Sequence, residues 1–183
     1  MATANAPVAA ADLALLEPTG ERRELVRGVL RVMSPAGGRH GRVAHALGLL
    51  VGAHVKLHDL GAVYAAETGF LLARGPDTVR APDMAFVSRS RAVPLDGDGG
   101  FVTVVPELVG EVVSPRDSFS DVEEKVLDWL SAGTRLVVVV DPATRTVHVH
   151  RPGGSVTVLR EAEVLDAGDA VPGLVIPVSE LFR

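Results

Sequence analysis

The chain has 183 residues, 47% of them hydrophobic and 22% charged, which is the composition of one ordinary globular domain. The net charge of -5 argues against a surface that coats nucleic acid as a whole, although it leaves room for a local basic groove. The absence of cysteine excludes disulfides, thiolate metal sites and cysteine nucleophiles.

The N-terminal segment predicts neither a membrane span nor a secretory signal. No apolar run approaches the roughly 20 residues needed to cross a bilayer, and residues 1–18 lack a basic n-region. We therefore expect a cytoplasmic protein without membrane contact. Residues 1–20 are expected to form an N-terminal tail, partly disordered or a short helix, and residues 21–183 a single domain.

The first half of that domain predicts a long helix between extended segments. Residues 21–35 read as a helix end that turns at Gly28 into a strand. Apolar residues recur with the 3.6-residue period from Val43 to Val55, which predicts a helix over about residues 40–60. Two segments that follow each read as one strand: residues 61–73 and residues 77–89.

The second half predicts a strand, a helix and three further strands. The strand covers Leu108 to Val113, and the helix carries a capping box with Ser120 as N-cap and Glu123 three residues later. Gly133 is placed to end that helix. Two helices and six or more strands in mixed order predict an α/β (α+β mixed) fold. The last three strands, joined by turn-rich segments, are residues 135–141, 146–151 and 155–160.

Glu111 stands in the middle of an apolar strand, where an unpaired carboxylate would cost several kcal/mol. Strand alternation places its side chain on the same face as Val109 and Val113. Lys125 lies at the border of the apolar stripe of the next helix, so its ammonium can reach toward the sheet. Only two of the 18 basic residues are lysines, so Lys125 points to chemistry that arginine does not supply.

A second acid, Asp83, follows a proline and leads directly into the apolar strand "MAFV". Two carboxylates on neighbouring strands are ligands that Mg²⁺ prefers, and a nearby ammonium would assist an attacking water. The residues alone leave a second interpretation open, in which Asp83 and Glu111 are separate structural acids.

Four quoted segments together resemble a known family. "RAPDMAFVS" and "PELVGEVVSPRDSFSDVEEKVLDWLSAGTRLVVVVDPATRTVHVHRP", with "RELVRGVLRVMSP" and "ETGFLL" upstream, are similar to the Uma-type family of putative restriction endonucleases in the PD-(D/E)XK nuclease superfamily. The similarity covers nearly the whole chain from about Glu21. It implies a restriction-endonuclease-like core, with a mixed β-sheet flanked by helices.

The resemblance also implies a metal site. It makes Asp83 and Glu111 the metal-binding carboxylates and the backbone carbonyl of Val112 a third ligand, with Mg²⁺ as the cofactor and Mn²⁺ as a substitute. Glu24 matches an early glutamate of the family and is expected to be a further acid at the site. Arg27 departs from the pattern, because many relatives have an acid there.

The lysine of the superfamily motif is displaced in this chain. Val113 occupies the position two residues after the glutamate, where the superfamily most often has its lysine. The chain resembles the variant in which the lysine has moved to the following helix, and Lys125 is the candidate for that role. Among the other polar residues, His40 is a candidate phosphate contact and Glu67 a candidate support for the site.

The resemblance implies an endonuclease that hydrolyses phosphodiester bonds in DNA with Mg²⁺ and acts as a homodimer. The alternative is a catalytically inactive nuclease-fold module that acts in binding or assembly, which the acidic net charge favours. Arginines that the first hypothesis would place against phosphates are Arg39, Arg42, Arg89 and Arg91.

Overall fold

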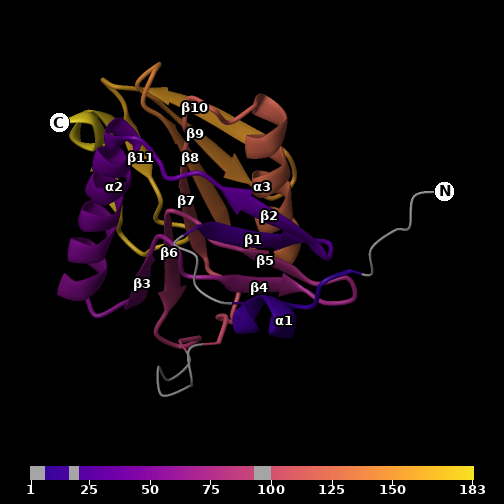
Figure 1. The fold of residues 1–183 in the computed structure, drawn as a ribbon. Coiled ribbons are helices and arrows are strands. Elements are labelled where there is room, and N and C mark those ends of the chain that lie inside the picture. Colours follow the sequence, from indigo (N-terminus) through magenta and orange to yellow (C-terminus); the bar gives the residue numbers. More distant parts are fainter. Residues whose placement is uncertain (1–6, 17–20, 93–99) are drawn as a thin grey trace.

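The computed structural model describes residues 7–16, 21–92 and 100–183. A large mixed sheet forms the centre, with one long helix on each of its faces and a small second sheet beside it (Figure 1). The α/β prediction, with a mixed sheet flanked by helices, is confirmed. The elements in chain order are α1 (Ala10–Leu15), β1 (Arg22–Val26), β2 (Val29–Met33), α2 (Gly38–Leu57), β3 (Gly61–Ala65), β4 (Phe70–Ala73), β5 (Thr78–Arg80), β6 (Met84–Ser88), β7 (Leu108–Val112), α3 (Phe119–Ala132), β8 (Leu136–Asp141), β9 (Thr146–Arg151), β10 (Ser155–Arg160), β11 (Val164–Asp166), β12 (Val175–Pro177) and a 3-10 helix, η1 (Val178–Phe182).

The large sheet has six strands in the order β10-β9-β8-β7-β6-β3. Its strand pairs are antiparallel except for β7 and β8, which are parallel. A parallel pair needs a crossover connection, and α3 supplies it. The central strand β7 therefore has β6 on one side and β8 on the other, and α3 directly follows it in the chain.

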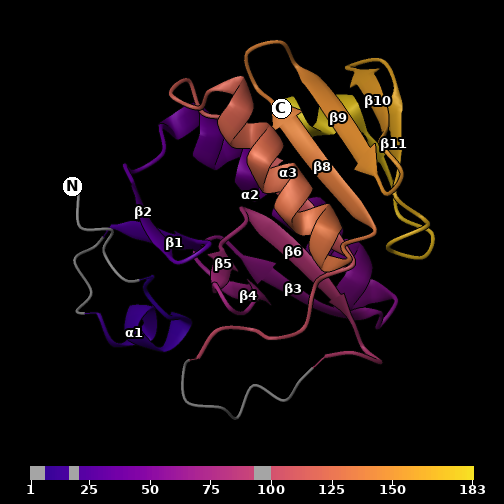
Figure 2. The same ribbon diagram turned by 90° about the vertical axis from the view of Figure 1, so that its right-hand side faces the viewer.

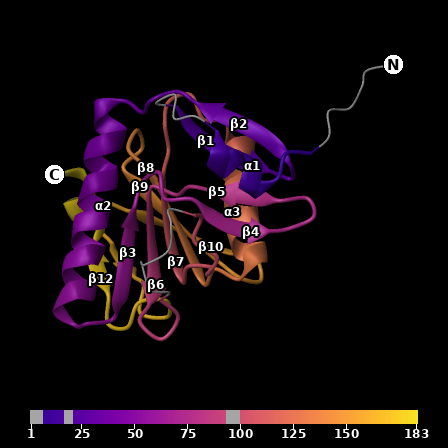
Figure 3. The same cartoon turned by 60° about the horizontal axis from the view of Figure 1, so that its bottom comes forward.

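The two faces of this sheet carry separate apolar cores. On one face α2 buries Val43, Leu47, Val51 and Val55, as the periodicity predicts. A Cβ on Gly110 of β7 would lie only 2.5 Å from Leu47 Cδ2, so glycine there lets α2 approach the sheet closely. The other face is covered by α3, whose buried residues are Val126 and Trp129 (Figure 3).

The N-terminal part of the domain differs from the prediction of a helix end at residues 21–35. β1 and β2 form a two-strand hairpin in which Val26 pairs with Val29. Arg27 and Gly28 in its turn have φ angles of 49° and 78°, and two consecutive residues with positive φ suit a tight hairpin between twisted strands. The apolar residues around Gly28 therefore belong to strands.

Two predicted strands are each divided between the two sheets. Residues 61–73 form β3 in the large sheet and β4 in the small one, and residues 77–89 form β5 in the small sheet and β6 in the large one. The first break contains Glu67, which has a φ of 72°, and the second contains Pro82, which lacks the N–H a strand donates. The small sheet has the order β2-β1-β5-β4.

The short helix α1 packs against the small sheet. Ala10 and Leu13 are buried in one cluster with Leu25 of β1 and Val79 of β5, so α1 contributes apolar contacts to the fold (Figure 2). The predicted tail lies partly outside the described residues, which begin at residue 7. Within the described ranges, no helix combines the length and apolarity that a bilayer crossing requires.

Helix α3 begins two residues before its predicted start. Its N-cap is Ser118, whose Oγ accepts the Asp121 N–H at 3.1 Å, while the Asp121 carboxylate accepts the Ser118 N–H at 3.1 Å. Both Ser118 and Ser120 have an acid three residues later, so the pattern alone did not distinguish them. The predicted C-cap is confirmed, because Gly133 has a φ of 110°.

The two serines allow a matched test. Ser118→Ala removes the cap of α3 and should lower the free energy of unfolding by about 1 kcal/mol. Ser120→Ala, at an exposed position inside the helix, should change it by less than about 0.5 kcal/mol. Urea denaturation followed by circular dichroism measures both values, and an equal effect of the two substitutions would contradict the observed helix start.

Candidate active site

The antiparallel register of β6 and β7 brings the two predicted acids together. Met84, the first residue of β6, pairs with Gly110 of β7. Because the strands are antiparallel, the residue before Met84, Asp83, lies opposite the residue after Gly110, Glu111. Residues in opposite positions of an antiparallel pair have Cβ atoms roughly 5 Å apart. The Val112 N–H donates to Asp83 Oδ2 at 2.8 Å, which holds Asp83 against the end of β7. The acids therefore meet at the same end of two adjacent strands.

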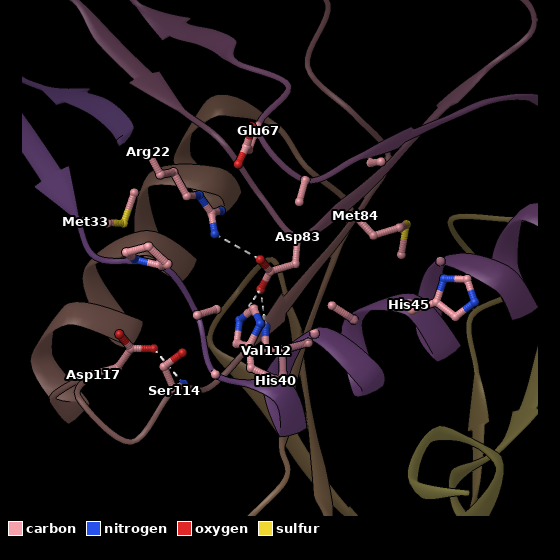
Figure 4. Close-up of a pocket in the computed structure, with 18 of the residues that line it drawn as sticks. Arg22, Met33, His40, His45, Glu67, Asp83, Met84, Val112, Ser114 and Asp117 are labelled. Atoms are coloured by element: carbon pink, nitrogen blue, oxygen red, sulfur yellow. Dashed lines mark hydrogen bonds and ion pairs between the residues drawn. The ribbon is translucent and has the colours of Figure 1, made fainter. Parts of the chain in front are cut away.

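Asp83 is buried and has three donors around its carboxylate. Arg22 Nη1 donates to Oδ1 at 3.0 Å, and His40 Nε2 lies 3.2 Å from Oδ2, which also accepts the Val112 N–H (Figure 4). Burial opposes ionisation, but the His40 hydrogen bond and the Arg22 charge outweigh it and lower the pKa of Asp83. The hydrogen bond with Asp83 also raises the pKa of His40, so each of the two groups favours the charged form of the other.

Glu111 has different partners and the opposite pKa shift. Trp129 Nε1 donates to its Oε1 at 3.0 Å, and Lys125 Nζ lies 3.5 Å from Oε2. Burial raises the pKa of Glu111; the Lys125 charge lowers it, and the Asp83 charge raises it again, so that the net shift is upward. The Glu111 charge in turn raises the pKa of Lys125, which keeps the ammonium protonated. Lys125 thus points toward the sheet, as its helical position predicts.

Glu24 lies beside this pair of acids with its oxygens engaged elsewhere. It is buried on β1, accepts Arg80 Nη1 at 2.9 Å and accepts the Ala81 N–H at 3.1 Å. Its charge contributes to the raised pKa values of Lys125 and Glu111. Glu24 thus fixes the segment that leads to Asp83, and its expected role as a site acid stays a prediction.

A pocket of about 1070 Å³ opens onto Asp83 and Lys125, whereas Glu111 lines a smaller neighbouring pocket that also includes Lys125. The walls of the larger pocket are the first half of α2, strand β3, the loop at residues 34–37 and the loop at residues 114–117 (Figure 4). Glu67 also lines it. Charged side chains of both signs face the pocket in equal number, apart from histidines: Arg22, Arg116, Lys125, Glu67, Asp83 and Asp117.

Two of the arginines expected at phosphates lie far from this pocket. Arg89 and Arg91 follow the C-terminal end of β6, whereas Asp83 precedes its N-terminal end. Arg91 pairs with Glu107 at 3.1 Å and Arg89 pairs with Asp59. Both arginines therefore lie at the opposite end of β6 from Asp83, and their expected contact with phosphates stays a prediction. The first-turn residue Arg39 is exposed, and Arg42 Nη2 donates to the Phe182 carbonyl at 3.3 Å.

Sequence reasoning missed Arg22 and Trp129, and it gave His40 a different role, a contact with phosphate. In the structure Arg22 and His40 bind Asp83, and Trp129 binds Glu111. Trp129 is buried in α3, and an indole N–H is a donor that seeks a partner when buried. For Arg22 and His40, the sequence shows only that a polar residue stands beside a predicted apolar element. It does not indicate that either side chain reaches Asp83.

The donor types at this site fit a hard divalent cation. Mg²⁺ is usually held by one or two carboxylates with further oxygen ligands. The Val112 N–H points to Asp83, and the carbonyl of a strand residue faces the same edge as its N–H, so the Val112 oxygen lies on the Asp83 side. Among the residues that the structure describes, however, no three His, Cys, Asp or Glu side chains already form a metal cluster.

Comparisons with known proteins agree on the fold. The sequence profile of the Uma2 family, described as "Putative restriction endonuclease", matches residues 10–179. Among solved structures, a putative nuclease belonging to DUF820 from Anabaena variabilis matches with a TM-score of 0.82 at 20% sequence identity, over 96% of this chain and 98% of that chain. No curated protein sequence gives a significant match. The DUF820 protein of Anabaena variabilis thus has the same fold as this chain.

The Asp83 network makes a prediction about acid stability. Asp83→Asn keeps the shape of the side chain but presents an amide N–H₂ to donors, so it should lower the free energy of unfolding at pH 7 by about 2 kcal/mol or more. The pKa of Asp83 is lowered in the folded protein, so its ionised form stabilises the fold above the unfolded pKa of about 3.9. That contribution is lost as the pH falls through the folded pKa.

The difference in unfolding free energy between wild type and Asp83→Asn should therefore shrink below about pH 4. Urea denaturation at a series of pH values measures it. Asp59→Asn, at an exposed acid that pairs with Arg89 beyond the other end of β6, is the matched control and should show little difference at any pH. A gap that stays constant from pH 7 to pH 3 would contradict the network.

Proposed function

Because the chain belongs to the Uma2 family, we propose that it is a Mg²⁺-dependent endonuclease that hydrolyses phosphodiester bonds in DNA, with Mn²⁺ as a substitute. The observation that carries the proposal is the meeting of Asp83, Glu111 and Lys125. Asp83 and Lys125 line one pocket, and Glu111 pairs with Lys125 and lies opposite Asp83 in the register of β6 and β7.

Asp83, Glu111 and the Val112 carbonyl are the proposed ligands of the cation. A cation bound there supplies a polarised phosphate and a water with a lowered pKa. The protein's own contribution is to hold these oxygens at the ends of two paired strands, which is a rigid support. Glu24 contributes indirectly, because its hydrogen bonds with Arg80 and the Ala81 N–H hold the segment before Asp83 in place.

Lys125 is proposed to orient the attacking water and to stabilise charge that develops on the phosphate. Its pKa is raised by Glu111, so the ammonium is a poor base and a good donor. Its side chain is 18% exposed and faces both the pocket and Glu111. Lys125 therefore acts as a positioned cation, and proton removal falls to the water's other neighbours.

The charge of the pocket supports a DNA substrate only together with a cation. Without a bound cation, the positive charges of the arginine and lysine side chains around the pocket equal the negative charges of the carboxylates. The net charge of the chain is -5. A divalent cation would make the site positive and attract a phosphate. Two further parts of the proposal rest on other grounds: a homodimer that cuts both strands follows from the resemblance, and a cytoplasmic location from the N-terminal sequence.

The alternative is a catalytically inactive nuclease-fold module that acts in binding or assembly. One observation favours it, because both carboxylates already have internal partners at every oxygen. Metal titration separates the two functions. A domain that binds neither Mg²⁺ nor Mn²⁺ at millimolar concentration cannot perform the proposed hydrolysis.

Removing either acid should abolish the activity. Asp83→Ala and Glu111→Ala each delete a proposed ligand, so Mg²⁺-dependent cleavage of a supercoiled plasmid should fall at least about 100-fold. Asp59→Ala, at an exposed acid that pairs with Arg89 beyond the other end of β6, should cut at the wild-type rate. Circular dichroism confirms that each variant is folded, and undiminished cleavage by folded Asp83→Ala or Glu111→Ala would remove these residues from the mechanism.

The two lysines of the chain allow a second test. Lys125→Met removes the positioned cation and should lower the cleavage rate about 100-fold or more, by analogy with removal of one charge-stabilising donor. Since a positive neighbour is lost, Mn²⁺ affinity should stay equal or rise. Lys56→Met, in the last turn of α2, should leave both quantities unchanged. A parallel loss of Mn²⁺ binding in Lys125→Met would instead assign Lys125 to the architecture of the metal site.

A further inference from the structure

Arg22 is the first residue of β1, and its guanidinium lies at the mouth of the acid pair. Nη1 donates to Asp83 Oδ1 at 3.0 Å, and Nη2 donates to the Ala81 carbonyl. The side chain is 17% exposed and lines the pocket (Figure 4). Within the described parts of the chain, its Nε is buried without a hydrogen-bond partner. One donor of the guanidinium is thus left for a further acceptor.

The positive charge of Arg22 interacts favourably with three carboxylates. Burial opposes its charge, but Asp83, Glu111 and Glu24 together raise the pKa of Arg22. This one guanidinium therefore balances much of the negative charge that Asp83 and Glu111 would offer to a metal ion. A divalent cation bound by the same acids would face Arg22 at short range, and the repulsion would weaken its binding at least about tenfold.

Arginine cannot relieve this repulsion by losing a proton. The Arg22 side chain can relieve the repulsion by breaking its ion pair with Asp83 and binding another anion that enters the pocket. The planar fork formed by Nε and Nη matches two phosphate oxygens, and the unpartnered Nε is one prong of that fork. A substrate phosphate provides the acceptor and the negative charge.

We propose that Arg22 is a phosphate-binding residue of this site, which Asp83 holds in place until a divalent cation takes over the carboxylate. The inference rests on the proposed function, since it assumes the cation and the phosphodiester. It assigns Arg22 two effects of opposite sign. Arg22 weakens metal binding in the free protein and strengthens the binding of DNA to the metal-loaded protein.

Mn²⁺ affinity tests the first effect without any cleavage. The signal of free Mn²⁺ in electron paramagnetic resonance gives the bound fraction for wild type, Arg22→Met, Arg22→Lys and Arg27→Met. Arg22→Met should bind Mn²⁺ at least about tenfold more tightly, whereas Arg22→Lys keeps the charge and should stay near wild type. Arg27→Met is the matched control, because Arg27 lies on the same hairpin but pairs with Glu124 and Asp128. If Arg22→Met does not fold, Arg22→Gln takes its place.

Fluorescence anisotropy of a labelled 20-base-pair duplex, with Ca²⁺ in place of the catalytic ion, tests the second effect. Arg22→Met should bind the duplex about tenfold more weakly than wild type, and the slope of log affinity against log salt should fall by about one. Arg27→Met should match wild type in both values. Unchanged DNA binding by Arg22→Met would overturn its role as a phosphate ligand.

The metal measurement also separates this inference from the proposed function. If wild type binds Mn²⁺, Asp83→Asn does not, and Arg22→Met binds no more tightly than wild type, the inference about Arg22 falls and the nuclease site stands. If neither wild type nor Arg22→Met binds Mn²⁺ at millimolar concentration, both fall. Tighter Mn²⁺ binding with weaker DNA binding in Arg22→Met supports the exchange of partners.

Discussion

Two buried carboxylates opposite each other on adjacent strands are the constraint on which the rest of this site depends. Two carboxylates this close together make it unfavourable for both to be ionised. The groups around Asp83 and those around Glu111 have opposite effects on the pKa. Asp83 receives Arg22, His40 and a backbone N–H, and its pKa falls. Glu111 receives one lysine and an indole N–H, and its pKa rises. The pair therefore combines one acid whose pKa is lowered with one whose pKa is raised.

The small sheet and the two long helices deliver the side-chain partners of this pair. The chain begins in the small sheet, enters the large sheet at β3, returns to the small sheet for β4 and β5, and enters the large sheet again at β6. This path brings Arg22 of β1 next to the segment before β6. The first turn of α2 brings His40 to the same carboxylate. The crossover from β7 to β8 returns along the other face as α3, and so places Lys125 and Trp129 on Glu111.

The sequence predicts the parts of the site that depend on local periodicity. Alternation in β7 gives the face of Glu111, and the 3.6-residue period of α3 gives the inward direction of Lys125; the 3.5 Å ion pair confirms both. Arg22 and His40 could not be assigned to Asp83, because that contact depends on how β1 pairs with β5 and how α2 packs on the large sheet. The divided strands were missed for a related reason. Residues 61–73 and 77–89 each carry apolar residues on both sides of a short break, and only the pairing of strands shows that the chain changes sheet there.

The balance of charge within the site explains how it can fold before any metal binds. In metal-dependent small domains the ligands repel one another without the ion, so that binding free energy becomes folding free energy. Here Arg22 and Lys125 supply positive charge to the acids from inside the chain, and Arg80 does the same for Glu24. A positively charged side chain beside these carboxylates stabilises the fold, and it would also compete with a metal ion for them. Under the proposed function, the same ion pairs that stabilise the buried carboxylates would also limit the affinity of the site for a divalent cation, and metal binding would then depend on the arrival of another anion.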